Sequence, residues 1–189
     1  ANGKISVATQ EHLGLPKIFQ HVSPERLNIF FLTIGGRTPQ QLEAELHAQG
    51  FRIAGDASFM MKSQDFTTEK LQEELQLIRL TVDDLFCDSQ WHTTDQIFSK
   101  AKELGLELCP AEVGPCLRLK MTDQMMSEWL FIGMKPITGL DGIPRIFGVE
   151  RDGDDSWLGN CWARPDYGWR PGYEFVFRLP VIGGANSHE

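Results

Sequence analysis

Aromatic and charged residues gather in one stretch near the C-terminus, and these residue types could form a binding surface. Four of the five tryptophans of the 189-residue chain lie between positions 129 and 169. Tryptophan, tyrosine and arginine are the residues that most often dominate binding hot spots. The segment 162–173, WARPDYGWRPGY, concentrates all three between prolines and glycines. We therefore expect a binding loop formed by Trp162, Arg164, Asp166, Tyr167, Trp169, Arg170 and Tyr173.

A second interpretation of the same loop involves no ligand. Arg164 could pair with Asp166 while Trp169 folds back over the edge of a sheet, because an indole brings a large apolar area. Trp157 and Trp162 are five residues apart, so an unbroken strand would place them on opposite faces. One of these two could then fill the core while the other meets a partner.

Cysteine chemistry is the enzymatic alternative. A cysteine nucleophile needs a base that activates its thiol and a group that orients the base. Cys109 or Cys87 could be the nucleophile, with His92 as the base. Glu112 or Asp95 could orient the imidazole. This set would suit a small hydrolase or transferase, but its spacing matches no catalytic signature and Cys109 lies in an apolar run, which favours packing.

Oxygen ligands for a cation cluster in the turn after residue 151. Asp152, Asp154 and Asp155, with Asn160 nearby, lack the spacing of an EF-hand, and an acidic hairpin turn explains them. The cysteines and histidines have no zinc spacing. We therefore expect no metal and no cofactor. Carboxylates for glycoside or phosphoester chemistry exist, but a sequence does not give their separation; they are Glu112, Glu128, Asp141 and Asp166.

Composition excludes two classes of partner. The net charge is −8, and no third of the chain is net basic. Binding to nucleic acid or to an anionic membrane depends on lysine and arginine, so both are disfavoured. No apolar run approaches the roughly 18 residues of a membrane span. With four cysteines and no disulfide framework, we expect a soluble cytoplasmic protein that binds a small molecule or a protein, or that forms a homo-oligomer with a structural role.

Local patterns predict four helices. Thr38, Pro39 and Gln41 form a capping box that begins a helix over 39–49. A similar threonine cap begins a helix over 94–104, and the segment 56–66 suits a short helix. In the acidic segment 67–86 we expect a helix that changes to a strand near residue 76. We expect residues 106–121, with Pro110, Gly114 and Pro115, to form a turn between two extended pieces.

Alternating apolar and polar residues predict strands elsewhere. The run 27–36 suits a buried strand, and 128–137, 144–152, 156–163 and 173–179 follow one another with short turns. Trp129 fits an ordinary strand position. Sequential strands with short connections favour an antiparallel meander. We expect an α+β fold with at least four such strands and packed helices, divided into a lobe or arm (1–66), a core domain (67–182) and a frayed tail (183–189).

Several segments in the second half resemble a recurrent group of hypothetical proteins from bacterial and metagenomic genomes. The segments occur in the same order and span roughly 77–180; they are TTDQIFSKAKELGLELCPAEVGPCLRL, EWLFIGMKPI, DGIPRIFGVERD, WLGNCWARPD and FVFRLP. The resemblance implies that these segments belong to one module. It transfers no activity, ligand or catalytic residue.

Overall fold

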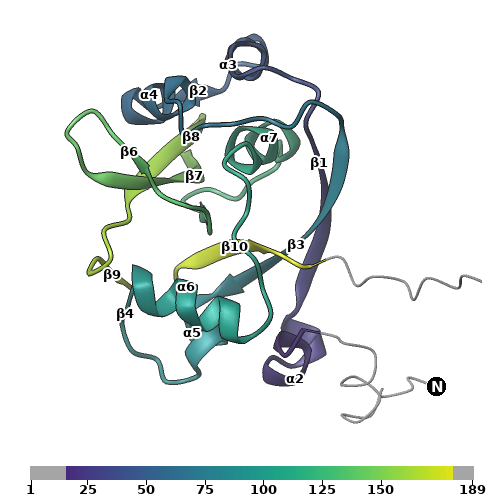
Figure 1. The fold of residues 1–189 in the computed structure, drawn as a ribbon, viewed down its shortest axis with the longest axis vertical. Coiled ribbons are helices and arrows are strands. Elements are labelled where there is room, and N and C mark those ends of the chain that lie inside the picture. Colours follow the sequence, from purple (N-terminus) through teal and green to yellow (C-terminus); the bar gives the residue numbers. More distant parts are fainter. Residues whose placement is uncertain (1–15, 181–189) are drawn as a thin grey trace, which may run out of the picture.

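One mixed β-sheet runs through residues 16–180, the part of the chain that this computed structural model describes. Seven of its eight strands follow the order β1-β3-β10-β5-β7-β8-β2, and β6 pairs with β7 (Figure 1). Two further strands, β4 and β9, form a separate ribbon. The strands are β1 (Asn28–Ile34), β2 (Arg52–Ile53), β3 (Glu73–Thr81), β4 (His92–Thr93), β5 (Trp129–Ile132), β6 (Ile137–Thr138), β7 (Pro144–Asp152), β8 (Asp155–Trp162), β9 (Gly168–Trp169) and β10 (Glu174–Arg178).

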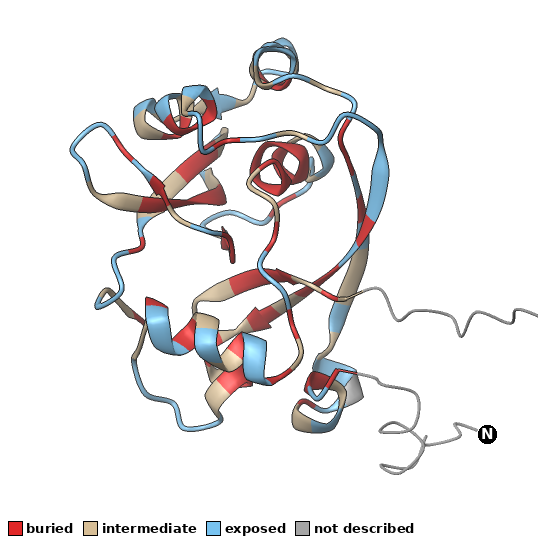
Figure 2. Cartoon of the chain, viewed as in Figure 1, coloured by how far each residue is buried: buried red, intermediate tan, exposed pale blue. Residues whose placement is uncertain are grey.

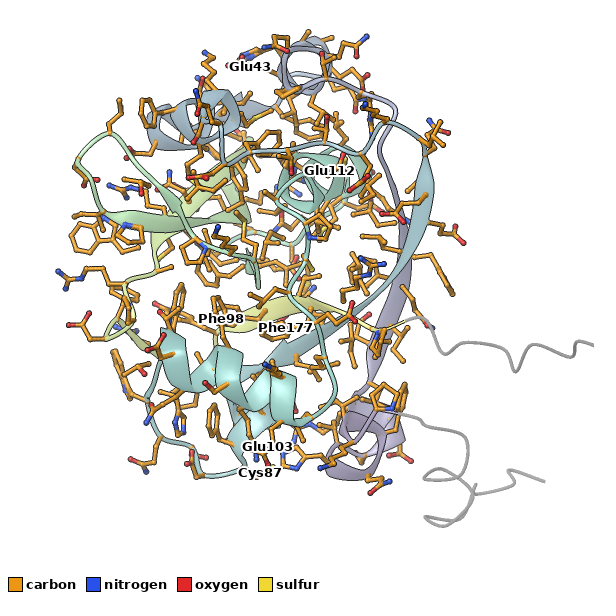
Figure 3. The ribbon with its side chains drawn as sticks, viewed as in Figure 1. Glu43, Cys87, Phe98, Glu103, Glu112 and Phe177 are labelled. Atoms are coloured by element: carbon orange, nitrogen blue, oxygen red, sulfur yellow. The ribbon has the colours of Figure 1, made fainter. Side chains whose placement is uncertain are left out.

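The helices cover both faces of the sheet. The sheet curves around α7, with β1 and β3 on one side and β7 and β8 on the other, and α3 and α4 lie beyond that helix (Figure 1). On the opposite face α6 packs on β10, where Phe98 meets Phe177 edge to face at 6.4 Å (Figure 3). The helices are α2 (Ile18–His21), α3 (Pro39–Ala48), α4 (Gly55–Lys62), α5 (Val82–Phe86), α6 (Thr94–Glu103) and α7 (Val113–Lys120), with a 3₁₀ turn at Pro24–Arg26.

The sheet confirms the α+β class and corrects the expected meander. Strands β5, β7 and β8 form antiparallel neighbours, as predicted. The last strand, β10, instead lies between β3 and β5 and runs parallel to β5. After β8 the chain therefore crosses one face of β7 and β5, which we call the outer face, before it enters β10. This crossing places Tyr167, Trp169 and Tyr173 on the outer face. Trp162, which pairs with Arg145 at the end of β8, alternates to the opposite face and reaches the loop only at the sheet edge, beside Tyr167.

The capped helices form where the sequence predicts them. Thr38 and Gln41 make the expected capping box of α3, and Thr93 and Gln96 make that of α6. A glycine with positive φ follows the end of each of these helices, as a left-handed residue should. The strand β1 lies inside its predicted segment, and the short helix α4 begins one residue before its predicted segment and ends inside it.

The helix expected in the acidic segment 67–76 is wrong. Glu73 already belongs to the nine-residue strand β3, which pairs with β1 on one side and β10 on the other. The buried Leu75, Leu77 and Leu80 supply apolar contacts in this central strand. Pairing on both sides outweighs the local preference of the glutamates and leucines for a helix.

The extended piece expected at 116–121 is also wrong, because these residues belong to α7. Pro115 lies in the first turn of this helix, where a missing N–H leaves no hydrogen bond unmade. Every residue from Val113 to Arg118 is buried (Figure 2). A helix that is buried on all sides, even at a charged residue such as Arg118, lacks the one-sided periodicity from which helices are predicted.

Elements on both sides of residue 66 contribute to the one sheet. Strands β1 and β2 and helices α3 and α4 come from the segment before this position. The predicted tail 183–189 and the first part of the predicted arm lie outside the described residues. Within residues 16–180, no helix has both the length and the apolar character needed to cross a membrane.

Gly114 sets how closely α7 approaches the sheet. A Cβ atom at this position would lie 2.7 Å from the Cβ of Phe147, a buried residue of β7. We expect Gly114→Ala to lower the free energy of unfolding by about 1–3 kcal/mol through overpacking. Urea denaturation measures the change. Gly55→Ala is the control, because nothing lies within 4 Å of that added Cβ; equal stabilities for the two variants would contradict the packing argument.

Candidate functional site

Trp169 is the centre of an aromatic cluster beneath the loop 162–173. It is fully buried, and its ring centroid lies 4.9 Å from that of Phe131 and 4.8 Å from that of Phe175. Its indole N–H donates to the Thr94 hydroxyl at 2.9 Å. Trp169 is therefore a core residue, which corrects its expected place on an exposed binding surface. Trp169 instead covers the sheet, as the alternative interpretation of a folded-back loop expected.

The register of the β4–β9 ribbon explains which side chains point inward. His92 is paired with Trp169, so the next pair outward along the ribbon is Trp91 and Arg170. Successive residues of a strand point to opposite faces. The inward position of Trp169 thus turns Arg170 outward, where its guanidinium lies 5.4 Å from the ring of Trp91 and 6.0 Å from that of Tyr173.

Exposed aromatic residues surround this buried centre. Trp91, Trp129 and Trp162 are 61%, 42% and 43% exposed. Tyr167 and Tyr173 are half-buried, and each makes ring contacts with Trp169. We call these five residues the aromatic rim. Of the predicted loop residues, Trp162, Tyr167 and Tyr173 belong to it; Arg170 lies beside it.

The remaining charged residues of the loop pair with each other. Arg164 Nε lies 3.5 Å from Asp166 Oδ1, and both side chains are largely exposed. Exposed pairs of this kind contribute about 0–1 kcal/mol. Arg164 and Asp166 thus match the pairing of the alternative interpretation and add little to a site.

Glu150 lies on the same face of the sheet, between two tryptophans. The register pairs it with Trp129 on β5 and with Trp157 on β8, so the three side chains form one cross-strand row. The next row contains Phe131 followed by two glycines, Gly148 and Gly159. The Glu150 carboxylate lies over the backbone of Gly159, where an added Cβ would meet its Oε1 at 2.6 Å.

The environment of Glu150 disfavours its charged form. Burial, with a smaller contribution from the nearby Asp152 carboxylate, raises the pKa of Glu150 to about 7. Among the described residues no hydrogen-bond donor or cation pairs with this carboxylate. Arg52, which follows Trp157 across the row, lies 5.6 Å from the Trp157 ring and pairs with Asp155 at 2.8 Å. Glu150 is thus a carboxylate without a partner beside two indoles.

Cys161 and Tyr167 complete the outer face near Glu150. The thiol lies 3.8 Å from the phenol oxygen. Burial raises the pKa of Cys161, and burial together with Cys161 raises that of Tyr167 to about 12. Both groups are neutral near pH 7, so neither supplies a nucleophile or a charge there.

The cysteine and histidine of the expected catalytic set do not lie together. Cys109 is buried and its thiol donates to the Val176 carbonyl, and burial raises its pKa far above the ordinary value. Cys87 is exposed, but its thiol lies 3.8 Å from His21 Nε2, and His92 pairs instead with Asp88. The predicted set of Cys109 or Cys87 with His92 is therefore wrong.

The predicted carboxylates also serve separate structural contacts. Glu112 accepts from the amides of Gly35 and Glu69 at 3.1 and 2.8 Å, which ties the end of β1 to the segment before β3. Figure 3 shows Glu112 beside α7 and Cys87 near α5 at the lower end of the molecule, well apart from each other. Of the others, Glu128 pairs with Arg79, Asp141 with Arg145 and Asp166 with Arg164, while Asp95 is an exposed residue in the first turn of α6.

A hollow of about 430 Å³ lies on the other face, between β1, β3, β5 and the end of α7. Its charged groups already have partners. Arg79 pairs with both Glu128 and Glu174, and Lys120 donates to the Phe31 carbonyl. Residues 16–180 contain no group of three or more histidine, cysteine, aspartate or glutamate side chains that could hold a metal ion.

Sequence reasoning missed Trp91, Trp129 and Glu150 as members of a surface. Gly148 and Gly159 were the available signal, because a glycine inside a strand often marks a close approach over its backbone. Trp91 lies far from the C-terminal stretch in sequence and joins it only through the β4–β9 pairing.

Comparisons with protein-family models, with curated proteins and with solved structures gave no match. The resemblance of segments 77–180 to bacterial hypothetical proteins thus stays a prediction. Function has to be argued from the geometry of the outer face.

Trp169 and Trp162 should differ in their effect on stability. We expect Trp169→Ala to lower the free energy of unfolding by about 3–5 kcal/mol, because it empties the centre of the cluster. Trp162→Ala should cost about 1 kcal/mol or less, since much of this side chain is exposed. Urea denaturation followed by circular dichroism measures both; a cost for Trp162→Ala as large as that for Trp169→Ala would contradict the assignment.

Glu150 should make stability depend on pH. Its pKa of about 7 in the folded protein lies above the ordinary 4.5, so the folded state is stabilised below pH 4.5 and loses that contribution as pH rises through 7. Glu150→Gln should therefore raise the free energy of unfolding by about 1 kcal/mol at pH 8, after allowance for solvent screening, and by nothing at pH 4. Denaturation of both proteins between pH 4 and 8 measures this difference. A variant that is less stable at pH 8 would show that Glu150 has an internal partner.

Proposed function

We propose that this chain is a non-enzymatic protein-binding module whose partner lies across the aromatic rim. The observation that carries the proposal is the exposure of Trp91 and Trp129 around a fully buried aromatic centre, with the exposed Trp162 beside Tyr167 at the edge of the same cluster. Large exposed aromatic side chains that lie close together are typical of interaction surfaces. Tryptophan, tyrosine and arginine, all present here, are also the residues enriched in binding hot spots.

The support beneath the rim favours binding without rearrangement. Trp169 is held by its hydrogen bond to Thr94 and by ring contacts with Phe131 and Phe175. Tyr167 and Tyr173 pack against it from the loop. A surface whose side chains are already ordered loses little entropy when a partner docks.

The charges beside the rim favour a polypeptide over a small apolar molecule. Arg170 has no carboxylate partner within residues 16–180, and Glu150 has no cation there. A peptide can offer an acidic group to Arg170 and a basic group to Glu150 while its apolar side chains cover the tryptophans. The hollow of about 430 Å³, which would suit a small molecule, does not include any residue of the rim.

Selection from a random-peptide library displayed on phage tests this function. We expect enrichment of peptides that bind the immobilised full chain, with dissociation constants measured by calorimetry. A double variant, Trp91→Ala with Arg170→Ala, should weaken their binding by at least tenfold, since it removes a stacked pair at the surface.

Phe59→Ala is the control, because Phe59 is an exposed aromatic residue on α4. Its binding should equal that of the unaltered chain. The proposal fails if the enriched peptides bind the double variant as tightly as the unaltered chain, or if no peptide is enriched above an unrelated protein. The rival explanation is that the rim forms the interface of a homodimer. Light scattering after size-exclusion chromatography tests it: a dimer of the unaltered chain and a monomer of the double variant would support the rival.

A further inference from the structure

We propose that Glu150 is the subsite of the aromatic rim that receives the cationic end of a basic side chain, lysine or arginine, from the partner. This inference rests on the proposed function and assigns the partner's chemistry at one position. It starts from the row Trp129–Glu150–Trp157, in which one carboxylate stands between two indoles on adjacent strands.

Each member of this row attracts a cation. An ammonium or guanidinium group is drawn to the face of an indole, and desolvation strengthens the attraction. The aliphatic stem of a lysine or arginine can lie along apolar surface while its charged end reaches a polar group. Trp157 already has an arginine, Arg52, at 5.6 Å from its ring, which demonstrates that a guanidinium fits beside this side chain.

The glycines beside the row make room for the carboxylate, which is half-buried over them. Gly148 and Gly159 carry no side chain that could cover it, and Glu150 lies directly over Gly159. Alanine at 159 would displace the carboxylate, since the added atom would lie 2.6 Å from Oε1. The two glycines thus shape the subsite without contacting the partner's charge.

The charged and titratable groups that face Glu150 leave it available to an outside cation. Asp152 on its own strand adds negative charge. On β8, Cys161 is neutral and Asp155 is engaged by Arg52. From the loop, Tyr167 is neutral as well. The unpaired carboxylate is half-buried, so a cation from a partner would restore the stability that desolvation removes.

A metal ion is a poorer occupant of the same place. Hard cations require several oxygen ligands. No group of three or more possible side-chain ligands occurs within residues 16–180. The two indoles and the buried apolar ring of Phe131 match an organic cation instead.

The probe is n-butylammonium chloride, which has the chain and charge of a lysine side chain. Nitrogen-15 NMR follows the indole N–H signals of Trp129 and Trp157, each assigned by its replacement with phenylalanine. At pH 8 we expect both signals to shift saturably. Neutral n-butanol and equal concentrations of sodium chloride should not reproduce these shifts.

Three comparisons then decide the inference. Glu150→Gln should weaken n-butylammonium binding at least tenfold. Glu74→Gln, which removes an exposed carboxylate of β3, should leave it unchanged. At pH 5 the affinity should fall at least tenfold, because the fraction of molecules with an ionised Glu150 falls.

The inference is overturned if Glu150→Gln binds n-butylammonium as the unaltered chain does, or if no saturable shift occurs. Such a result would not contradict the proposed function, because peptides could still bind the rim. Their weaker binding to the double variant Trp91→Ala with Arg170→Ala would still be expected. Conversely, amine binding at Glu150 without any rim-dependent peptide would contradict the proposed protein partner and leave a site for a small amine.

Discussion

The burial of α7 against the concave face of the sheet is the constraint on which the rest of the molecule depends. It brings the whole side chain of Arg118 into the interior, where no carboxylate of residues 16–180 pairs with it. Arg118 donates to Gln124 at 2.6 Å, to the Glu150 carbonyl at 3.1 Å and to the Met121 carbonyl, and lies 4.8 Å from the Phe51 ring. Burial lowers its pKa to about 10, so it stays charged near neutral pH.

This inner network also determines the outer face. Gln124, positioned by Arg118, donates to the Val149 carbonyl, so the backbone of β7 is held at two successive residues from within. Glu150 then projects outward from a fixed backbone, over Gly159. The crossing of segment 163–173 lays Trp169 on the same face and leaves the aromatic rim around it. The position of the Glu150 backbone thus depends on the packing of one helix on the other side of the sheet.

The sequence predicted those parts of the structure that local chemistry determines. Capping by Thr38 and Thr93 and the alternation in β7 and β8 depend on neighbours in the chain, and these predictions were confirmed. Helix α7 and strand β3 depend on burial and on pairing with distant strands, so the local sequence patterns predicted the wrong secondary structure for both. The same holds for the site: the aromatic loop was visible, but its inward tryptophan and the contribution of Glu150 arise from strand register.

Carbon-detected NMR of the Glu150 side-chain carboxyl, titrated between pH 3 and 9 in the free protein, tests the central claim most directly. The signal would be assigned with Glu150→Gln. A carboxylate that is desolvated beside two indoles and has no internal partner should titrate near 7. A pKa at or below the ordinary value of 4.5 would mean that Glu150 is solvated or already paired, and would contradict its role as an open site for a cation.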